Sequence, residues 1–124
     1  MNSDVLVTGG SQGIGRAIVA RLLADAFPVI NVDLKAPPAL LDGETHVQAD
    51  LTDASALRDA VNQIAARGNV LRLVNNAGIV RPALLEDTTP EDMAAVNALN
   101  LTAPLLLLQG LLPGMRAAGF GRGE

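Results

Sequence analysis

The sequence is organised around one glycine-rich stretch close to its start. Residues 5–8 (Val-Leu-Val-Thr) are a short apolar run, and Gly9, Gly13 and Gly15 follow at close spacing. The run predicts a buried parallel strand, the glycines predict a tight turn, and the residues from Ile14 onward predict an amphipathic helix. Such a unit presents backbone N–H groups and a helix N-terminus, which together form a site for an anion such as phosphate.

Apolar strands and amphipathic helices alternate along the rest of the chain. The pattern predicts strands at 5–8, 29–33, 45–49 and 70–74, and helices at 14–26, 52–67 and 89–115. Thr52 or Asp53 would cap the second helix, and Thr89 followed by Pro90 would begin the third. Strands that alternate with helices form a parallel sheet with right-handed crossovers, so the expected fold class is α/β, with no second domain.

Composition excludes several classes of protein. The chain has 124 residues, 49% hydrophobic but only 2% aromatic, so Leu, Val, Ile and Ala must form the core. It contains no Cys, and its net charge of −4 with nine scattered basic residues argues against binding to nucleic acid. Residues 1–4 lack the basic start of a signal peptide, and the apolar run 101–112 is too short and interrupted to span a bilayer. We therefore expect a cytoplasmic protein without a membrane segment, and no metal site.

The glycine turn and Asp33 together point to a dinucleotide. Gly9 turns the chain out of the strand, Gly13 lets the backbone approach a pyrophosphate, and Gly15 lets the helix pack on the sheet. Asp33 ends the second strand near the expected offset of about 20 residues, where a carboxylate accepts ribose hydroxyls. A turn without a ligand and a solvated acid are the alternatives. A nucleotide-hydrolase loop is disfavoured because no Lys follows the glycines.

Several short motifs resemble those of the classical short-chain dehydrogenase/reductase family. Residues 8–15 resemble its TGxxxGIG motif, 50–52 its D-L/V-T motif, 75–78 its NNAG motif and 100–103 its N-L-T-G motif, in the right order. The resemblance implies a Rossmann-type doubly wound parallel sheet that lacks the C-terminal strands and helices of the full fold. Residues 1–118 would form an incomplete dinucleotide-binding domain, and 119–124 a flexible tail at a truncation point.

The resemblance also implies roles for individual residues. The residues around the pyrophosphate and nearby ribose would be Gly9, Ser11, Gln12, Gly13, Ile14 and Gly15. The residues along the adenosine and the middle of the cofactor would be Asp33, Asp50, Leu51, Asn76, Ala77 and Gly78. The adjacent pair Asn75-Asn76 has ordinary turn chemistry as its alternative. NAD is favoured over NADP because the Asp33 carboxylate repels a 2′-phosphate, although the nearby Lys35 weakens that argument.

Asn100 is the one catalytic candidate. Pro104 has no N–H, so in a continuous helix the Asn100 carbonyl would lose its normal donor and need another partner. In the family that the chain resembles, this carbonyl holds a water in a proton relay. A plain kink is the alternative, and Asn97 is a competing candidate. The family's Tyr-x-x-x-Lys motif is missing, since the sequence has no Tyr and its only Lys is Lys35.

The sequence therefore predicts the cofactor-binding front half of an NAD(H)-dependent oxidoreductase acting on a small alcohol or carbonyl compound. This chain alone is expected to be inactive, and a non-catalytic NAD-binding or regulatory module on the same fold is the alternative. The leucine run 105–108 should be buried on all sides, at a subunit interface of a homo-oligomer or against the rest of the fold. Residues 71–74 should expose a strand edge.

Overall fold

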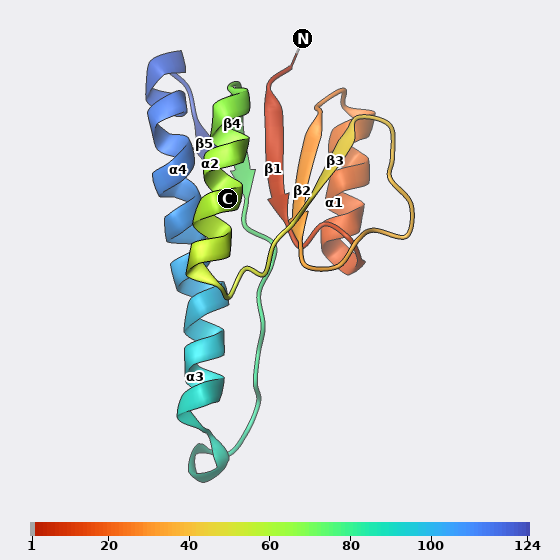
Figure 1. The fold of residues 1–124 in the computed structure, drawn as a ribbon. Helices are drawn as coiled ribbons and strands as arrows, with labels where there is room; N and C mark the ends of the chain where they lie inside the picture. Colours follow the sequence, from red (N-terminus) through yellow and green to blue (C-terminus); the bar gives the residue numbers. More distant parts are fainter. Residues whose placement is uncertain (1) are drawn as a thin grey trace.

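The computed structural model describes residues 2–124 and shows a parallel five-stranded sheet with helices on both faces (Figure 1). The strands are β1 (Asp4–Thr8), β2 (Val29–Asp33), β3 (Glu44–Gln48), β4 (Val70–Val74) and β5 (Arg122–Gly123). Their order is β3-β2-β1-β4-β5, and every neighbouring pair is parallel. The main helices are α1 (Gly13–Ala24), α2 (Ala54–Arg67), α3 (Pro90–Asn97) and α4 (Ala103–Ala118). The predicted α/β fold is confirmed.

The two faces of the sheet carry separate cores because side chains alternate along each strand. On one face, Val5 and Val7 of β1 pack with Val19 of α1. On the other face, Leu6 belongs to the larger cluster under α2 and α4, which includes Leu57 and Leu107. Figure 1 shows α1 on the opposite side of the sheet from α2 and α4. The cores consist of aliphatic side chains, as the composition predicts.

The helices begin where local chemistry predicts. Of the two candidate caps for α2, it is Asp53 that accepts hydrogen bonds from the backbone N–H groups of Ser55 and Ala56, both at 3.1 Å. The hydroxyl of Thr89 accepts from the N–H of Asp92 at 3.1 Å, and Pro90 begins α3. These side chains satisfy backbone donors that have no partner within the helix.

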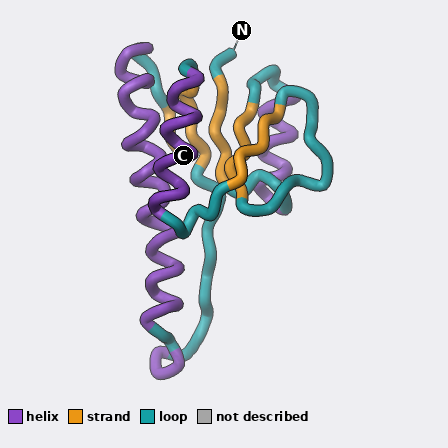
Figure 2. Tube along the Cα trace, in the orientation of Figure 1, coloured by secondary structure: helices purple, strands orange, loops and turns teal. Residues whose placement is uncertain are grey.

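A π-helical turn, η2 (Ala98–Thr102), joins α3 to α4 in one continuous helical segment. The backbone N–H of Ala103 donates to the carbonyl of Ala98, five residues back, and Pro104 follows without an N–H. The predicted disturbance near Asn100–Pro104 is therefore confirmed. The segment carries α3 beyond the end of the sheet (Figure 2).

This helical segment, Pro90–Ala118, has 29 residues and is long and apolar enough to cross a membrane. The prediction considered only residues 101–112, which are shorter than this segment. Helices in the cores of soluble proteins pass the same test, so the evidence for a membrane is weak. Here Leu106, Leu107 and Leu111 are buried in the core under α4. A cytoplasmic location stays a prediction.

One face of this helix is uncovered in the single chain, so the burial expected for residues 105–108 at an interface or against further parts of the fold stays a prediction. Four leucines at helical spacing form an exposed line that we call the leucine stripe: Leu101 (69% exposed), Leu105 (54%), Leu108 (38%) and Leu112 (38%). α2 and the sheet cover only the opposite face of α4, where Leu107 and Leu111 lie.

The C-terminal residues, expected to be a flexible tail, include a short strand. Arg122 and Gly123 form β5, which pairs with Arg72 and Leu73 of β4. The pairing continues through Glu124, whose N–H donates to the Leu73 carbonyl at 2.9 Å and whose carbonyl accepts from Asn75. The strand edge at residues 71–74 is therefore partly covered. Backbone hydrogen bonds to β4, rather than side-chain preference, place this strand.

The two aromatic side chains of the molecule stack on one arginine. The guanidinium of Arg72 lies 4.9 Å from the ring centre of Phe27 and 4.7 Å from that of Phe120, and it donates to the Ser3 hydroxyl at 2.8 Å. Phe27 precedes β2 and Phe120 precedes β5. Arg72 therefore joins three separate segments of the chain.

We expect Arg72→Met to lower the free energy of unfolding by about 1–2 kcal/mol, because both cation–π contacts are lost while the aliphatic packing is kept. Urea unfolding followed by circular dichroism measures the change. Arg81→Met, in an exposed loop, is the matched control and should leave stability unchanged. An Arg72→Met protein as stable as the parent would show that the stacking contributes nothing.

Candidate cofactor site

A pocket of about 410 Å³ lies where the carboxyl ends of the strands meet. The strand order reverses at β1, between β2 and β4, and this switch point is where open α/β sheets bind ligands. The predicted cofactor residues that line the pocket are Gly9, Gln12, Asp33, Asp50, Leu51, Asn76, Ala77 and Gly78. Lining residues that were not predicted are Leu34, Ala49, Thr52, Ile79 and Leu99. The structure therefore brings together residues from the ends of β1, β2, β3 and β4.

The glycines of the turn fit distinct steric requirements. Gly9 and Gly13 have φ angles of 67° and 58°, in the left-handed region that favours glycine. A Cβ on Gly15 would lie 2.0 Å from the Gly9 carbonyl oxygen, so no side chain fits there. A Cβ on Gly13 would meet nothing within 4 Å. The backbone at Gly13 is thus open to a ligand, while Gly15 is packed beneath the turn.

The start of α1 suits an anion. The side chain of Gln12 makes no capping hydrogen bond, and the first turn of α1 contains no acidic residue. Backbone N–H groups at a helix start attract negative charge when side chains leave them free. Ile14, which the resemblance places near the pyrophosphate, is 76% exposed at this end. The exposure places Ile14 on the solvent side of the turn.

Thr8 fastens the end of β1 to the segment that follows β4. Its hydroxyl oxygen accepts hydrogen bonds from the N–H groups of Asn76 and Ala77, at 3.1 and 3.0 Å. The Asn76 amide donates to the Gly9 carbonyl at 3.2 Å. Asn76 therefore holds the segment after β4 against the end of β1. Thr8 was not among the predicted site residues, and its place at the end of a buried strand was the available signal.

Asp33 is fixed from two sides. One carboxylate oxygen accepts from the backbone N–H of Ser11 at 3.1 Å, and the other accepts from that of Lys35 at 3.2 Å. Ser11 is only 3% exposed and lies behind Asp33 rather than in the pocket lining. The carboxylate thus stands at one wall of the pocket in a fixed orientation.

Asp50 is held by its neighbour in the Asp-Leu-Thr motif. The Thr52 hydroxyl donates to Asp50 Oδ1 at 2.6 Å, and the Thr52 backbone N–H donates to the same oxygen at 2.9 Å. Hydrogen bonds from the Thr52 side chain and then its backbone hold the pKa of Asp50 below its ordinary value. Asp50 therefore presents an ionised, hydrogen-bond-accepting carboxylate at the pocket.

The Asn100 side chain is committed to a structural contact. Its Oδ1 accepts from the Ile79 N–H at 3.0 Å, and its Nδ2 donates to the Ile79 carbonyl at 2.8 Å. Asn100 itself is not in the pocket lining, although Ile79 is. The side chain ties η2 to the chain that leaves β4. The main-chain carbonyl is therefore the group of Asn100 with which the predicted water would interact, and that role stays a prediction.

The donors and acceptors of the pocket fit the adenosine and pyrophosphate of a dinucleotide. Gly13 is not in the pocket lining but follows Gln12, which is, and its open backbone and the free helix start suit phosphate. The two carboxylates of the lining, Asp33 and Asp50, suit hydroxyl and amino donors. Within residues 2–124, no group of three His, Asp or Glu side chains is placed to hold a metal ion.

Comparisons of the sequence and of the structure with known proteins agree on one family. The sequence model for short chain dehydrogenase matches residues 3–122. Acetoacetyl-CoA reductase from Rhizobium meliloti (strain 1021) is 35% identical, over 98% of this chain and 53% of that protein. A short chain dehydrogenase from Leptospira borgpetersenii, solved with bound NAD⁺, has a TM-score of 0.88 and 28% identity, over 99% of this chain and 50% of that one.

A further structure, ElxO with NADP bound, has a TM-score of 0.86 and 25% identity, over 99% of this chain and 54% of that chain. The present chain spans about half the length of the curated relatives that it matches. The family match covers nearly every residue of the sheet and its helices. By this match and by the pocket at its switch point, the chain belongs to the short chain dehydrogenase family.

Proposed function

We propose that this chain is the cofactor-binding part of an NAD(H)-dependent oxidoreductase that acts on an alcohol or carbonyl compound. The observation that carries the proposal is the fixed Asp33 carboxylate at the wall of a pocket that begins at an open glycine turn. Relatives with oxidoreductase names support the reaction class. Because the relatives are about twice as long as this chain, a substrate is proposed for the whole protein and not for this chain alone.

The preference for NAD rests on charge. A carboxylate at the end of β2 accepts the ribose hydroxyls of NAD and repels the 2′-phosphate of NADP. Solved relatives hold either cofactor, so the family alone does not decide between them. Lys35 is the nearest cation in the chain after Asp33, but only its backbone contacts the Asp33 carboxylate. The Lys35 side chain should therefore affect the choice between NAD and NADP less than the fixed Asp33 carboxylate does.

The residues of this chain would bind and orient the dinucleotide cofactor. The N–H groups at the start of α1 would hold the pyrophosphate, Asp33 the ribose, and Asp50 the adenine amino group. Nicotinamide, when bound, exchanges a hydride with the substrate at its C4 atom. The Asn100 carbonyl would hold a water for proton transfer. This chain contributes no Tyr that could donate the proton.

We also infer that the protein is a homo-oligomer joined through the leucine stripe. Leu101, Leu105, Leu108 and Leu112 share one exposed face of the long helix. A contiguous exposed line of leucines is typical of a contact surface. A second copy of the same helix offers a matching apolar face, since symmetric dimers bring one patch against itself.

Titration with each cofactor tests the proposed preference. We expect the protein to bind NAD at least about tenfold more tightly than NADP, because the 2′-phosphate meets the Asp33 charge. Asp33→Asn should weaken NAD binding about tenfold and should reduce the difference in affinity between NAD and NADP. Asp42→Asn, in an exposed loop, is the control and should change neither affinity. Equal binding of NAD and NADP by the parent would contradict the assignment.

The 124-residue chain by itself should not turn over substrate. Its sequence has no Tyr to act as the general acid of the family, and general acid–base catalysis contributes about 10²–10⁴-fold. The measurement is the change in NADH absorbance with a panel of small alcohols and ketones. Substrate-dependent turnover by the purified 124-residue chain would show that another group donates the proton.

Sedimentation velocity tests the proposed interface. The double substitution Leu105→Glu with Leu108→Glu should convert an oligomer into monomer, because burying two carboxylates in an apolar contact is strongly unfavourable. Leu40→Glu, at a leucine that is 62% exposed in a loop, is the matched control and should leave the oligomer intact. An unchanged sedimentation coefficient in the stripe variant, with a native circular dichroism spectrum, would rule out this surface.

A further inference from the structure

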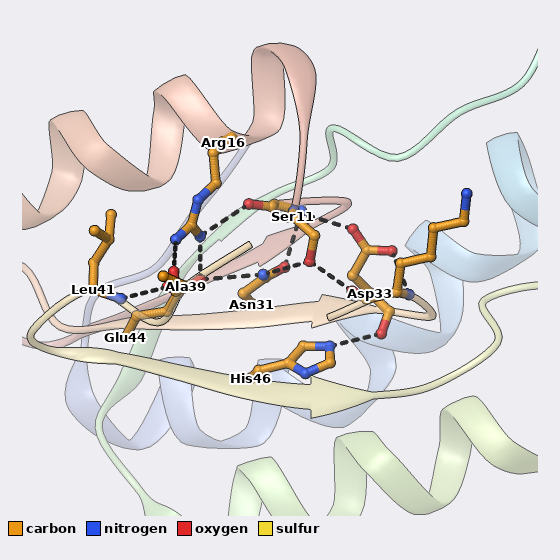
Figure 3. A network of polar contacts seen from close by, with 10 residues as sticks. Ser11, Arg16, Asn31, Asp33, Ala39, Leu41, Glu44 and His46 are labelled. Carbon is orange, nitrogen blue, oxygen red and sulfur yellow. Dashed lines mark hydrogen bonds and ion pairs between the residues drawn. The ribbon is translucent and has the colours of Figure 1, made fainter. Parts of the chain in front are cut away.

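A buried amide lies in the middle of β2, where its neighbours are apolar. Asn31 is 0% exposed and interrupts the apolar run Val29–Val32. Its Oδ1 accepts from the Gly10 N–H at 2.9 Å, and its Nδ2 donates to the Ser11 hydroxyl at 3.0 Å and to Glu44 at 3.2 Å (Figure 3). An unsatisfied buried amide would cost about 1–3 kcal/mol. Every polar atom of this side chain is instead paired, which fixes its orientation.

Glu44, at the start of β3, is the buried charge of the same cluster. Its side chain is 0% exposed, its Oε2 pairs with the Arg16 Nη1 at 2.5 Å, and its Oε1 accepts from the Leu41 N–H at 3.0 Å. Burial raises the pKa of Glu44, but hydrogen bonds from Arg16, Leu41 and Asn31 outweigh it and leave the pKa lowered. The carboxylate is therefore ionised at neutral pH.

Arg16 connects this cluster to two separate backbone segments. Its Nη1 also donates to the Gly10 carbonyl at 3.3 Å, and its Nη2 donates to the Ala39 carbonyl at 2.6 Å. Ala39 belongs to the loop between β2 and β3, which Ser11 also holds by donating its hydroxyl to the Lys35 carbonyl at 2.7 Å. One guanidinium thus joins the glycine turn to the loop that follows Asp33 (Figure 3).

The cluster contacts the glycine turn without entering the pocket. Asn31 holds the N–H of Gly10, and the next residue, Ser11, presents its own N–H to the Asp33 carboxylate. A Cβ on Gly10 would lie 2.7 Å from Asn31 Oδ1, so the turn packs too closely against this amide to accept a side chain at residue 10. Arg16 and Glu44 do not line the pocket; Glu44 is linked to Ser11, and so to Asp33, through Asn31.

We propose that Arg16, Glu44 and Asn31 are positioning residues that hold Gly10, Ser11 and Asp33 in the conformation that receives the adenosine ribose of the dinucleotide. The inference rests on the proposed cofactor function. The three side chains act before binding: they keep the Ser11 N–H on Asp33 and the loop after β2 closed against α1. Their loss weakens binding of the adenosine half and spares the nicotinamide half.

A purely structural role makes a different prediction. If the cluster only stabilised the fold, its loss would lower thermal stability and weaken every ligand equally. A positioning role separates ligands that contain adenosine from those that do not. Replacing both charges of a buried ion pair is often close to neutral for stability, so such a variant can remain folded.

The experiment uses the full-length protein and the double variant Arg16→Met with Glu44→Gln. Dissociation constants are measured for NADH by its own fluorescence, for ADP-ribose by competition, and for reduced nicotinamide mononucleotide, which lacks the adenosine half. We expect the first two to rise about tenfold and the third to stay unchanged. Arg21→Met removes the exposed Arg21–Asp25 pair on the same helix and should change none of them.

Hydrogen exchange on the parent protein gives a second measurement that needs no variant. The N–H groups of Gly10 and Ser11 should exchange slowly before any ligand is added, because Asn31 and Asp33 already hold them. Exchange as fast as in the exposed loop at residues 81–84 would overturn the inference, and this result stands even if the double variant fails to fold.

Two further outcomes would overturn it in the variant. ADP-ribose bound as tightly as by the parent would show that the cluster does not position the site, and an equal loss for all three ligands would show a structural role. A parent protein that binds neither NADH nor NADPH would overturn the proposed function itself, and the inference with it. That failure is recognised before any variant is made.

Discussion

The close approach of the glycine turn to the start of α1 is the contact on which the rest of the structure depends. A Cβ at Gly15 would stand 2.0 Å from the Gly9 carbonyl and 2.5 Å from the Asn76 amide nitrogen. With no side chain there, α1 begins directly beneath the end of β1 and its N-terminus faces the pocket. Thr8 and Asn76 then fasten the end of β4 to the same turn. The cleft at the switch point follows from this packing.

Features governed by local chemistry could be predicted from the sequence. Thr89 and Pro90 begin α3 because an oxygen acceptor and a residue without an N–H suit a helix start. Pro104 predicts a break in regular hydrogen bonding, and the π-helical turn lies there. The position of Asp33 at the end of β2 followed from strand length alone. In each case the cause lies within a few residues of its effect.

Features that depend on what covers a surface could not be predicted. Periodicity placed Leu105 on an apolar helix, but it does not say whether another element packs on each of its faces. The pairing of β5 with β4 involves Arg122 and Gly123, which have no strong preference for strands. The contacts of Asn31 reach residues far away in the sequence, so the sequence shows only a polar residue in an apolar strand.

Energetics explain why the polar cluster under Asp33 points to the site rather than to stability. A buried ion pair such as Arg16–Glu44 contributes little net stability, because the loss of water around two charges offsets their attraction. Apolar side chains of similar size would hold α1 to the sheet as well, as Val5, Val7 and Val19 do further along the same face. Apolar side chains have no directional contacts with which to fix an N–H on a carboxylate. A cluster that contacts Ser11 through Asn31 is therefore best explained by the orientation that it imposes on Ser11 and Asp33.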